Sequence, residues 1–179
     1  MIALTHTLKN GQTLLIREAT ALDAPAVLDH VHAIAGESDY LSFGPGEFDL
    51  PVEQERLILQ RYHEAHNQLY LLGLLGGQIV STLSFAGGHR PRIAHTGELG
   101  LSVRAAQWGL GIGGLMLDAL LDWARDAQVV AKINLRVRTD NQRAIALYLR
   151  KGFALEGTIR KAIRIDGTDY DHHWMGLEL

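Results

Sequence analysis

The sequence predicts a mixed α/β fold with a mostly antiparallel central sheet of about seven strands and about four helices. Seven segments have the length and apolar pattern of strands, and four others have apolar residues at helical spacing. The turn pairs Gly76-Gly77 and Asp166-Gly167 each indicate a hairpin between two strands. In the second half, one helix between two strands indicates a single parallel crossover.

The first half of the chain contains one strand, two helices and a hairpin, in that order. Residues 13–19 (TLLIREA) form the strand, and the segment LDAPAVLDHVHAIAGES forms a helix that ends near Gly36. A loop rich in glycine and proline, residues 38–50, leads to the second helix, in which Pro51 takes the first helical position. Residues 69–87 form the first hairpin.

The second half consists of the crossover, a short helix and the C-terminal hairpin. The crossover comprises strand 95–103 (HTGELGLSV), the amphipathic helix 111–126 and strand 132–138 (KINLRVR). The short helix NQRAIALYLRK follows and ends at Gly152. A chain of 179 residues fits one domain, so we expect a single domain with residues 1–12 as an N-terminal extension.

Composition excludes several classes of protein. A net charge of −3 and a pI near 6.3 argue against general binding to nucleic acid or to anionic membranes. The absence of cysteine excludes disulfides, a thiolate nucleophile and a cysteine-based zinc site. The start of the chain lacks the pattern of a signal peptide, and no apolar run reaches the length of a membrane span. We therefore expect a soluble cytoplasmic protein.

The glycines before the crossover helix predict a site for a phosphate-bearing ligand. Gly109, Gly111 and Gly114 fit the dinucleotide spacing G-x-G-x-x-G, and glycines that open a helix let backbone N–H groups bind an anion. A dinucleotide fold needs repeated β-α-β units, whereas this chain has one crossover and five residues between Val103 and Gly109. NAD is thus disfavoured, and a P-loop is excluded because no Gly-Lys-Ser/Thr follows.

Two segments resemble the acyl-CoA-binding motifs of the GNAT superfamily of N-acetyltransferases. The first, ELGLSVRAAQWGLGIGGLML within residues 95–127, has a strand ending in Val103 followed by the pattern Arg/Gln-x-x-Gly-x-Gly/Ala. Gly111 and Gly113 match that pattern, and Trp108 stands where Arg or Gln is usual. In the second, within residues 132–153, the pattern Asn-x-x-Ala-x-x-x-Tyr-x-x-x-Gly-Phe is met by Asn141, Ala144, Tyr148, Gly152 and Phe153.

The resemblance implies an acyl-CoA N-acyltransferase fold with acetyl-CoA as cosubstrate and no metal. It places the pyrophosphate on backbone N–H groups and the pantetheine arm between the two crossover strands. The cofactor-binding residues that it implies are Leu101, Ser102, Val103, Trp108, Gly109, Leu110, Gly111, Ile112, Gly113, Gly114, Asn141, Ala144, Tyr148 and Lys151.

The short helix provides the first catalytic candidate, Tyr148. Asn141, Ala144, Tyr148 and Lys151 share one face of this helix, and Ile145 and Leu149 lie on another that can pack in the core; Asn141 can also serve only as a helix cap. A phenol on the first face can hydrogen-bond a sulfur or protonate a leaving thiolate. The alternative for Tyr148 is a packing role with its hydroxyl at the surface.

Glu98 is the candidate general base, and His95 is the second choice. Related enzymes often carry a glutamate in this region of the strand, but alternation along the strand does not fix the face that Glu98 occupies. A solvated or structurally paired carboxylate is the alternative. Some protein-acetylating relatives carry a glutamate where this chain has Arg136, which weakens an assignment to ribosomal proteins.

The predicted function is transfer of an acetyl group to a primary amine by direct attack. The acceptor is a small molecule, such as an amino acid or polyamine, or a protein. A CoA-binding module without turnover and a dinucleotide-dependent oxidoreductase remain alternatives.

We expect no metal site among the nine histidines, packing roles for the three tryptophans, and possible homodimerisation through Trp174 and Met175. The resemblance implies that the region around the first two helices and the C-terminal hairpin set the acceptor specificity. Acidic residues there favour a cationic amine: Glu37, Asp39, Glu47, Asp169 and Asp171.

Overall fold

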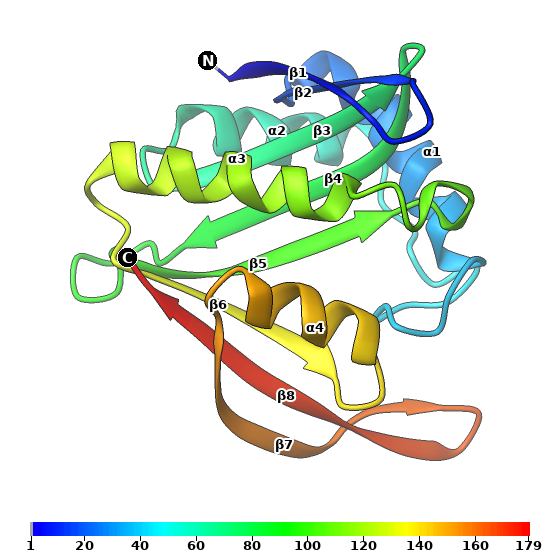
Figure 1. The fold of residues 1–179 in the computed structure, drawn as a ribbon, viewed down its shortest axis with the longest axis vertical. Helices are drawn as coiled ribbons and strands as arrows, with labels where there is room; N and C mark the ends of the chain where they lie inside the picture. The colour runs from blue at the N-terminus through cyan, green and yellow to red at the C-terminus, as the bar shows by residue number, and fades with distance from the viewer. Residues whose placement is uncertain (1) are drawn as a thin grey trace.

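The computed structural model describes residues 2–179, which form one eight-stranded mixed sheet with helices on both faces (Figure 1). The strand order is β1-β2-β3-β4-β5-β6-β8-β7, and among these strands the β5–β6 pair is parallel and the others antiparallel. The strands are β1 (Ala3–Thr7), β2 (Thr13–Glu18), β3 (Gln68–Leu75), β4 (Gln78–Gly87), β5 (Thr96–Val103), β6 (Lys132–Arg138), β7 (Ala154–Ile165) and β8 (Thr168–Glu178). The helices are α1 (Ala24–Ala35), α2 (Val52–Glu64), α3 (Ile112–Ala127) and α4 (Gln142–Arg150), with short 3-10 turns at Ala21–Asp23 and Ala105–Gln107.

The fold confirms the predicted class and adds one strand. Residues 1–12 were expected as an extension, but β1 pairs with the free edge of β2, with Ala3 opposite Arg17. The turn between them is closed by a hydrogen bond from the Leu8 N–H to the Gln12 carbonyl (2.8 Å). Another difference is at Pro51, which is the N-cap of α2 and not its first helical residue.

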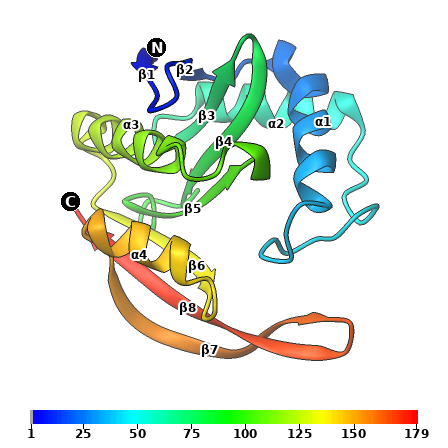
Figure 2. The ribbon, with the colours of Figure 1, turned by 45° about the vertical axis from the view of Figure 1, so that its right-hand side comes forward.

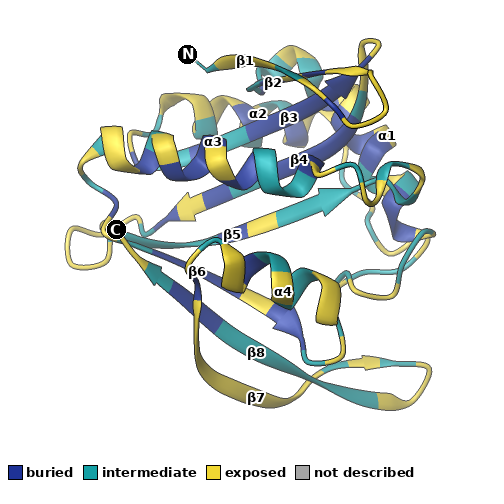
Figure 3. Ribbon diagram, viewed as in Figure 1, coloured by how far each residue is buried: buried dark blue, intermediate teal, exposed yellow. Residues whose placement is uncertain are grey.

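Apolar residues bury the two faces of the sheet under different helices. α3 and α4 lie on one face and α1 and α2 on the other (Figures 1 and 2). The larger core lies under α3, where Ile112, Met116 and Leu120 are fully buried, and a smaller core around Leu59 and Leu72 lies under α2. Burial is dense on the central strands β3, β4 and β6 and low on the edge strand β7 (Figure 3).

The short helix α4 packs differently from the prediction. Its buried residue is Tyr148, while Leu149, expected in the core, is exposed. Ile145 packs against the core as expected. Because Leu147 packs against Gly113 and Gly114 of α3, the helix lies with its Ala144–Leu147–Tyr148 side toward α3 and the sheet. This rotation brings Tyr148 into the protein and leaves Leu149 in solvent.

Strands β5 and β6 separate after a short parallel ladder. The ladder runs from Thr96 opposite Lys132 to Glu98 opposite Asn134, whereas β5 continues to Val103 and β6 to Arg138. The two strands therefore open into a V in the middle of the sheet (Figure 1). Within residues 2–179, no residue of β5 beyond Glu98 is paired with β6, and the V becomes the floor of a cleft.

Candidate active site

A cleft of about 1180 Å³ follows the V between β5 and β6. It is bounded by the loop that opens α3, by α4, and by the loop after α1. Most of the predicted cofactor residues line it, although Leu110 packs against the core instead. Those that line the cleft are Leu101, Ser102, Val103, Trp108, Gly109, Gly111, Ile112, Gly113, Gly114, Asn141, Ala144, Tyr148 and Lys151.

The backbone of β5 presents hydrogen-bonding groups to the cleft at alternate residues. The Arg104 N–H donates to the Val80 carbonyl (2.8 Å), and the Ser102 carbonyl accepts from Ser81 Oγ (2.7 Å), so these residues face β4. In an antiparallel pair the backbone direction alternates, so Leu101 and Val103 face the cleft. The predicted contacts at Leu101 and at the Val103 N–H are thus available, whereas the Val103 carbonyl accepts from the Trp108 indole and the backbone of Ser102 is directed away from the cleft.

The start of α3 carries a run of unpaired backbone donors. Gly111 is the N-cap with φ of 88°, Gly109 has φ of 83°, and both values favour glycine. The Gly114 and Leu115 N–H groups donate to the Gly111 carbonyl, whereas within residues 2–179 the N–H groups of residues 109–113 have no acceptor. Such a run at the positive end of a helix is suited to a phosphate.

Trp108 bridges the two motifs across the mouth of the cleft. Its indole N–H donates to the Val103 carbonyl (2.7 Å), and the Arg143 guanidinium lies 4.7 Å from its ring centroid. The side chain is 40% exposed, so the predicted packing role is wrong for Trp108. It holds for Trp123, whose ring lies 5.9 Å from that of Phe85 in the core.

The second motif places Asn141, Tyr148 and Lys151 along the opposite wall. Asn141 Oδ1 accepts from the Ala144 N–H (3.2 Å), so Asn141 caps α4. Tyr148 is 8% exposed, and burial raises its pKa to about 12, which keeps the phenol protonated at neutral pH. Within residues 2–179 its hydroxyl has no hydrogen-bond partner. Lys151 Nζ donates to Asp118 Oδ1 (2.6 Å), an ion pair that offsets its charge near Gly114.

Glu98 lies on the other face of the sheet, the face covered by α1. Side chains on β5 alternate, so Glu98 and Ser102 share a face, and Ser102 Oγ lies 2.8 Å from Nε2 of His30 on α1. Glu98 Oε1 accepts from Arg136 Nε (2.7 Å), and both side chains border the cleft. The structure thus pairs Glu98 with Arg136, one of the alternatives that the sequence left open.

His95, the second choice as base, does not line the cleft. It precedes β5 and is exposed, and its carbonyl accepts from the N–H groups of Ala131 and Lys132. The other histidines also gather no metal site: within residues 2–179 no group of three potential ligands is close enough to hold an ion. In the same described range, no helix has both the length and the apolar character that a membrane crossing requires.

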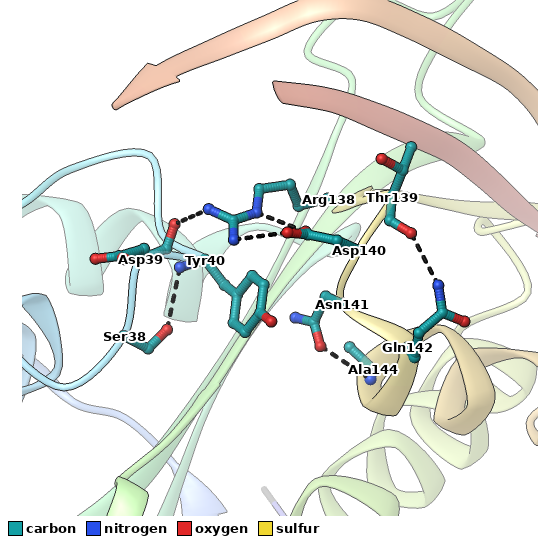
Figure 4. A network of polar contacts seen from close by, with 9 residues as sticks. All are labelled: Ser38, Asp39, Tyr40, Arg138, Thr139, Asp140, Asn141, Gln142 and Ala144. Carbon is teal, nitrogen blue, oxygen red and sulfur yellow. Dashed lines mark hydrogen bonds and ion pairs between the residues drawn. The ribbon is translucent and has the colours of Figure 1, made fainter. Parts of the chain in front are cut away.

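Sequence reasoning missed a network around Arg138 that fixes the loop after α1 (Figure 4). The guanidinium donates to both carboxylate oxygens of Asp140 (2.7 and 2.9 Å) and to the Asp39 carbonyl (3.0 Å). Its carbon lies 4.5 Å from the ring centroid of Tyr40 and 4.2 Å from that of Tyr170. Arg138 holds the pKa of Asp140 below its usual value. The spacing Arg-x-Asp in LRVRTDN was the available signal, but the two tyrosines come from distant segments.

A buried histidine supports β5 from the α1 side. His30 contacts Ser102, whose hydroxyl also lies 2.8 Å from Thr82 Oγ1. The pKa of His30 is lowered to about 4: burial and the nearby Arg104 lower it, and the Ile79 carbonyl and Glu37 act in the opposite direction. His30 is therefore neutral at pH 7 and accepts or donates hydrogen bonds without carrying a charge.

This histidine predicts a loss of stability on acidification. Because the pKa is about 4 in the folded chain and about 6.5 unfolded, the unfolded chain binds the proton more tightly, and stability falls as pH drops from 6.5 toward 4. The full loss in the free energy of unfolding is about 3 kcal/mol. We expect wild-type protein to lose about 2 to 3 kcal/mol more than His30→Gln between pH 7 and pH 4.5, as measured by urea unfolding. Equal losses in the two proteins would contradict the assignment.

Comparison with known proteins agrees with this geometry. The model of the Acetyltransferase (GNAT) family matches residues 32–153, which is more than half of the chain and includes both motifs. The chain belongs to the GNAT family. A solved GNAT acetyltransferase from Streptococcus pneumoniae is 30% identical, with a TM-score of 0.91 over 93% of this chain and 99% of that one. The resemblance and the fold class predicted from the sequence are thereby confirmed.

Two named relatives within GNAT differ in their acceptors. L-amino acid N-acetyltransferase AaaT of Escherichia coli is 28% identical over 105 residues, 59% of this chain and 65% of that enzyme. N-alpha-acetyltransferase RimI of Mycobacterium tuberculosis is 44% identical over 69 residues, 38% of this chain and 41% of that one. The matched region thus spans less than two thirds of the length of either relative.

Proposed function

We propose that this GNAT protein is an acetyl-CoA-dependent N-acetyltransferase that moves an acetyl group to a primary amine by direct attack. The observation that carries the proposal is the pair of candidate groups on opposite sides of the V. Tyr148 borders the cleft from the α4 side and Glu98 from the α1 side. A thioester held between β5 and β6 would have a proton donor near its sulfur and a proton acceptor on the side from which an amine approaches.

The cosubstrate site is proposed from donors that lack a protein partner. The N–H groups of residues 109–113 suit the pyrophosphate, and the cleft-facing backbone at Leu101 and Val103 suits the amide groups of the pantetheine arm. Trp108 replaces the usual Arg or Gln without removing any backbone donor. Glu98 precedes Val103 by five residues, or about 17 Å along β5, so an arm that follows β5 from the start of α3 runs toward the narrow end of the V.

Each protein group has one role in the proposed reaction. Acetyl-CoA supplies the activated acetyl group as substrate. Glu98 takes a proton from the attacking amine, directly or through water. A cleft-facing N–H group of β5 beside the thioester stabilises the negative charge on the carbonyl oxygen. Tyr148, protonated at neutral pH, donates a hydrogen bond or its proton to the departing sulfur.

The class of acceptor is proposed from the relatives. AaaT is an L-amino acid N-acetyltransferase and RimI an N-alpha-acetyltransferase, so a free amino acid and a protein N-terminus are both candidates. We propose a cytoplasmic enzyme without nucleic acid or membrane partners. Homodimerisation stays a prediction, but it cannot use Met175 as expected, because Met175 is buried in the core of the chain.

Ligand-dependent melting and thiol release test the proposed function together. We expect acetyl-CoA and CoA, but not NAD, to raise the melting temperature, since ligands that bind only the folded state stabilise it. Release of free CoA from acetyl-CoA should then depend on an added amine. Stabilisation by CoA without amine-dependent release would indicate a CoA-binding module without turnover, and stabilisation by NAD would favour the oxidoreductase alternative.

Glu98→Gln should slow the reaction without weakening cosubstrate binding. The amide keeps the shape of the side chain but cannot accept the proton, so we expect kcat/KM for the amine to fall by no more than about 10²-fold, the low end of the range for general-base catalysis. The defect should shrink as the pH approaches the pKa of the amine, because an amine that is already neutral has one proton fewer to lose to the base. An unchanged rate at pH 7 would leave Glu98 with its structural pairing alone.

A further inference from the structure

Among the described cleft residues on the α1 side of the sheet, Arg136 has a guanidinium that is largely unengaged. Arg136 uses only Nε, in its bond to Glu98, and the side chain is 52% exposed. Within residues 2–179 its two terminal nitrogens have no partner. Arg138, two residues on, is buried between two tyrosine rings and already donates to Asp140 and Asp39. Of these two arginines, Arg136 is the one able to accept a new anionic partner.

The Glu98–Arg136 ion pair lies at the narrow end of the V. Glu98 closes the parallel ladder opposite Asn134, and Arg136 is the next residue of β6 on the same face. Because the parallel ladder ends at Glu98, the pair lies at the point at which the two strands separate. This is also the end of the cleft toward which the proposed thioester arm runs. An acceptor there would meet a carboxylate and a guanidinium side by side.

The surrounding charges leave this pair as the local recognition element. Most of the acidic residues that the sequence offered for a cationic acceptor already have partners: Glu37 pairs with Arg104 (2.6 Å), Asp169 pairs with Arg164 (2.6 Å), and Glu47 and Asp171 accept backbone N–H groups. Asp39 does not line the cleft. His172 lies opposite Arg138 in the β6–β8 pair, and burial together with Arg136 and Arg138 lowers its pKa, which disfavours a charge on it at pH 7. A second cationic group on the acceptor would lie beside Arg136 without a carboxylate of its own to bind, which disfavours a polyamine.

A molecule that carries an amine and a carboxylate on one carbon matches the pair. Its ammonium group replaces Arg136 as the partner of Glu98, and its carboxylate replaces Glu98 as the partner of Arg136, with both terminal nitrogens available for a bidentate bond. The exchange frees Glu98 from the guanidinium and places it beside the amine. A protein N-terminus offers only a neutral peptide carbonyl at this position, which makes one weaker hydrogen bond.

We propose, on the basis of the proposed transferase function, that Arg136 binds the α-carboxylate of the acceptor and that the acceptor is therefore a free α-amino acid. Arg136 is then the residue that distinguishes an amino acid from a simple amine or a peptide N-terminus. Glu98 and Arg136 together orient the amine toward the thioester.

The test compares amino acids with the amines that lack only the carboxylate. At saturating acetyl-CoA, kcat/KM is measured for L-leucine, L-methionine and L-phenylalanine, for 3-methylbutylamine, 3-(methylsulfanyl)propylamine and 2-phenylethylamine, and for a tetrapeptide with a free N-terminus. Charge-assisted hydrogen bonds of this kind correspond to a preference of about 10- to 100-fold for the amino acid. Arg136→Gln should remove this preference by slowing only the amino acids, and Arg136→Lys should retain part of it.

The control is Arg160→Gln, which removes an exposed arginine from β7 outside the cleft and should leave the preference unchanged. If wild-type protein acetylated an amine or the peptide as fast as the amino acids, the proposal would be overturned. An equal loss of kcat/KM for all acceptors in Arg136→Gln would overturn it as well. Calorimetric titration of the CoA-bound protein with the amino acids separates the two proposals. If amino-acid binding depends on Arg136 but no CoA is released from acetyl-CoA, the carboxylate site is upheld and the transferase function is overturned. If neither amino-acid binding nor CoA release is seen, both proposals are overturned.

Discussion

Replacement of Tyr148 by phenylalanine is expected to lower kcat by about 10²-fold or more, the range typical of a general acid, with little change in the affinity for acetyl-CoA. The ring packs edge-on against Phe153 (5.8 Å) and stays in place in the variant, so only the hydroxyl is lost. Burial raises the pKa of that hydroxyl to about 12, so it is a hydrogen-bond donor across the working pH range. Single-turnover measurement of thiol release isolates the chemical step.

The matched control for this variant is Tyr62→Phe. Tyr62 is a half-buried tyrosine, packed edge-on against Tyr70 (5.4 Å) on the far side of the sheet from α4 and outside the cleft. Its variant loses the same hydroxyl at a site remote from the cleft and should turn over at the wild-type rate. If Tyr148→Phe also turned over at that rate, Tyr148 would be a packing residue and the assignment of a proton donor would be wrong.

Loss of cosubstrate binding is the second large effect, expected on replacing Gly111 or Gly113 by valine. A Cβ at Gly113 would lie 3.3 Å from a methyl of Leu147 and 3.6 Å from one of Leu101, so valine would fill the cleft where α3, α4 and β5 meet. At Gly111, with φ of 88°, valine would distort the run of free N–H groups. Loss of even two charge-assisted hydrogen bonds corresponds to about 10²-fold or more in affinity.

Backbone strain at Gly111 must be separated from loss of the phosphate site. Gly77, in the β3–β4 turn, has φ of 84° and open space around its Cα, which makes Gly77→Val a control with the same kind of strain. Both variants should lose stability, and only Gly111→Val should lose affinity for acetyl-CoA in calorimetry. Wild-type affinity in a folded Gly111→Val or Gly113→Val protein would contradict the proposed phosphate site.

Local sequence patterns were sufficient to predict the cleft wall formed by α3 and α4. Gly109 and Gly111 specify positive φ before a helix, and the Asn141–Ala144–Tyr148 spacing puts three residues on one side of α4. Both features depend on residues close together in the chain, where steric rules and helical periodicity apply directly. For that reason the start of α3 and the N-cap of α4 were located to within one residue.

The acceptor side of the cleft depends on contacts between distant residues, which a single sequence does not reveal. Arg136 is 38 positions from Glu98, and the rings that enclose Arg138 come from the loop after α1 and from β8. Trp108 was expected to pack because it is large and apolar, but a hydrogen bond to Val103 and a stacked arginine hold it at the surface. Strand β1 was missed because its pairing depends on the free edge of β2.

The most direct test of the account is a crystal structure of the protein with bound acetyl-CoA. We expect the diphosphate oxygens within hydrogen-bond distance of the N–H groups of residues 109–113, and the pantetheine arm hydrogen-bonded to Leu101 and Val103 between β5 and β6. The thioester sulfur should lie beside the Tyr148 hydroxyl, with the carbonyl carbon open to the side that carries Glu98 and Arg136. A diphosphate bound elsewhere, or an arm outside the V, would contradict the account.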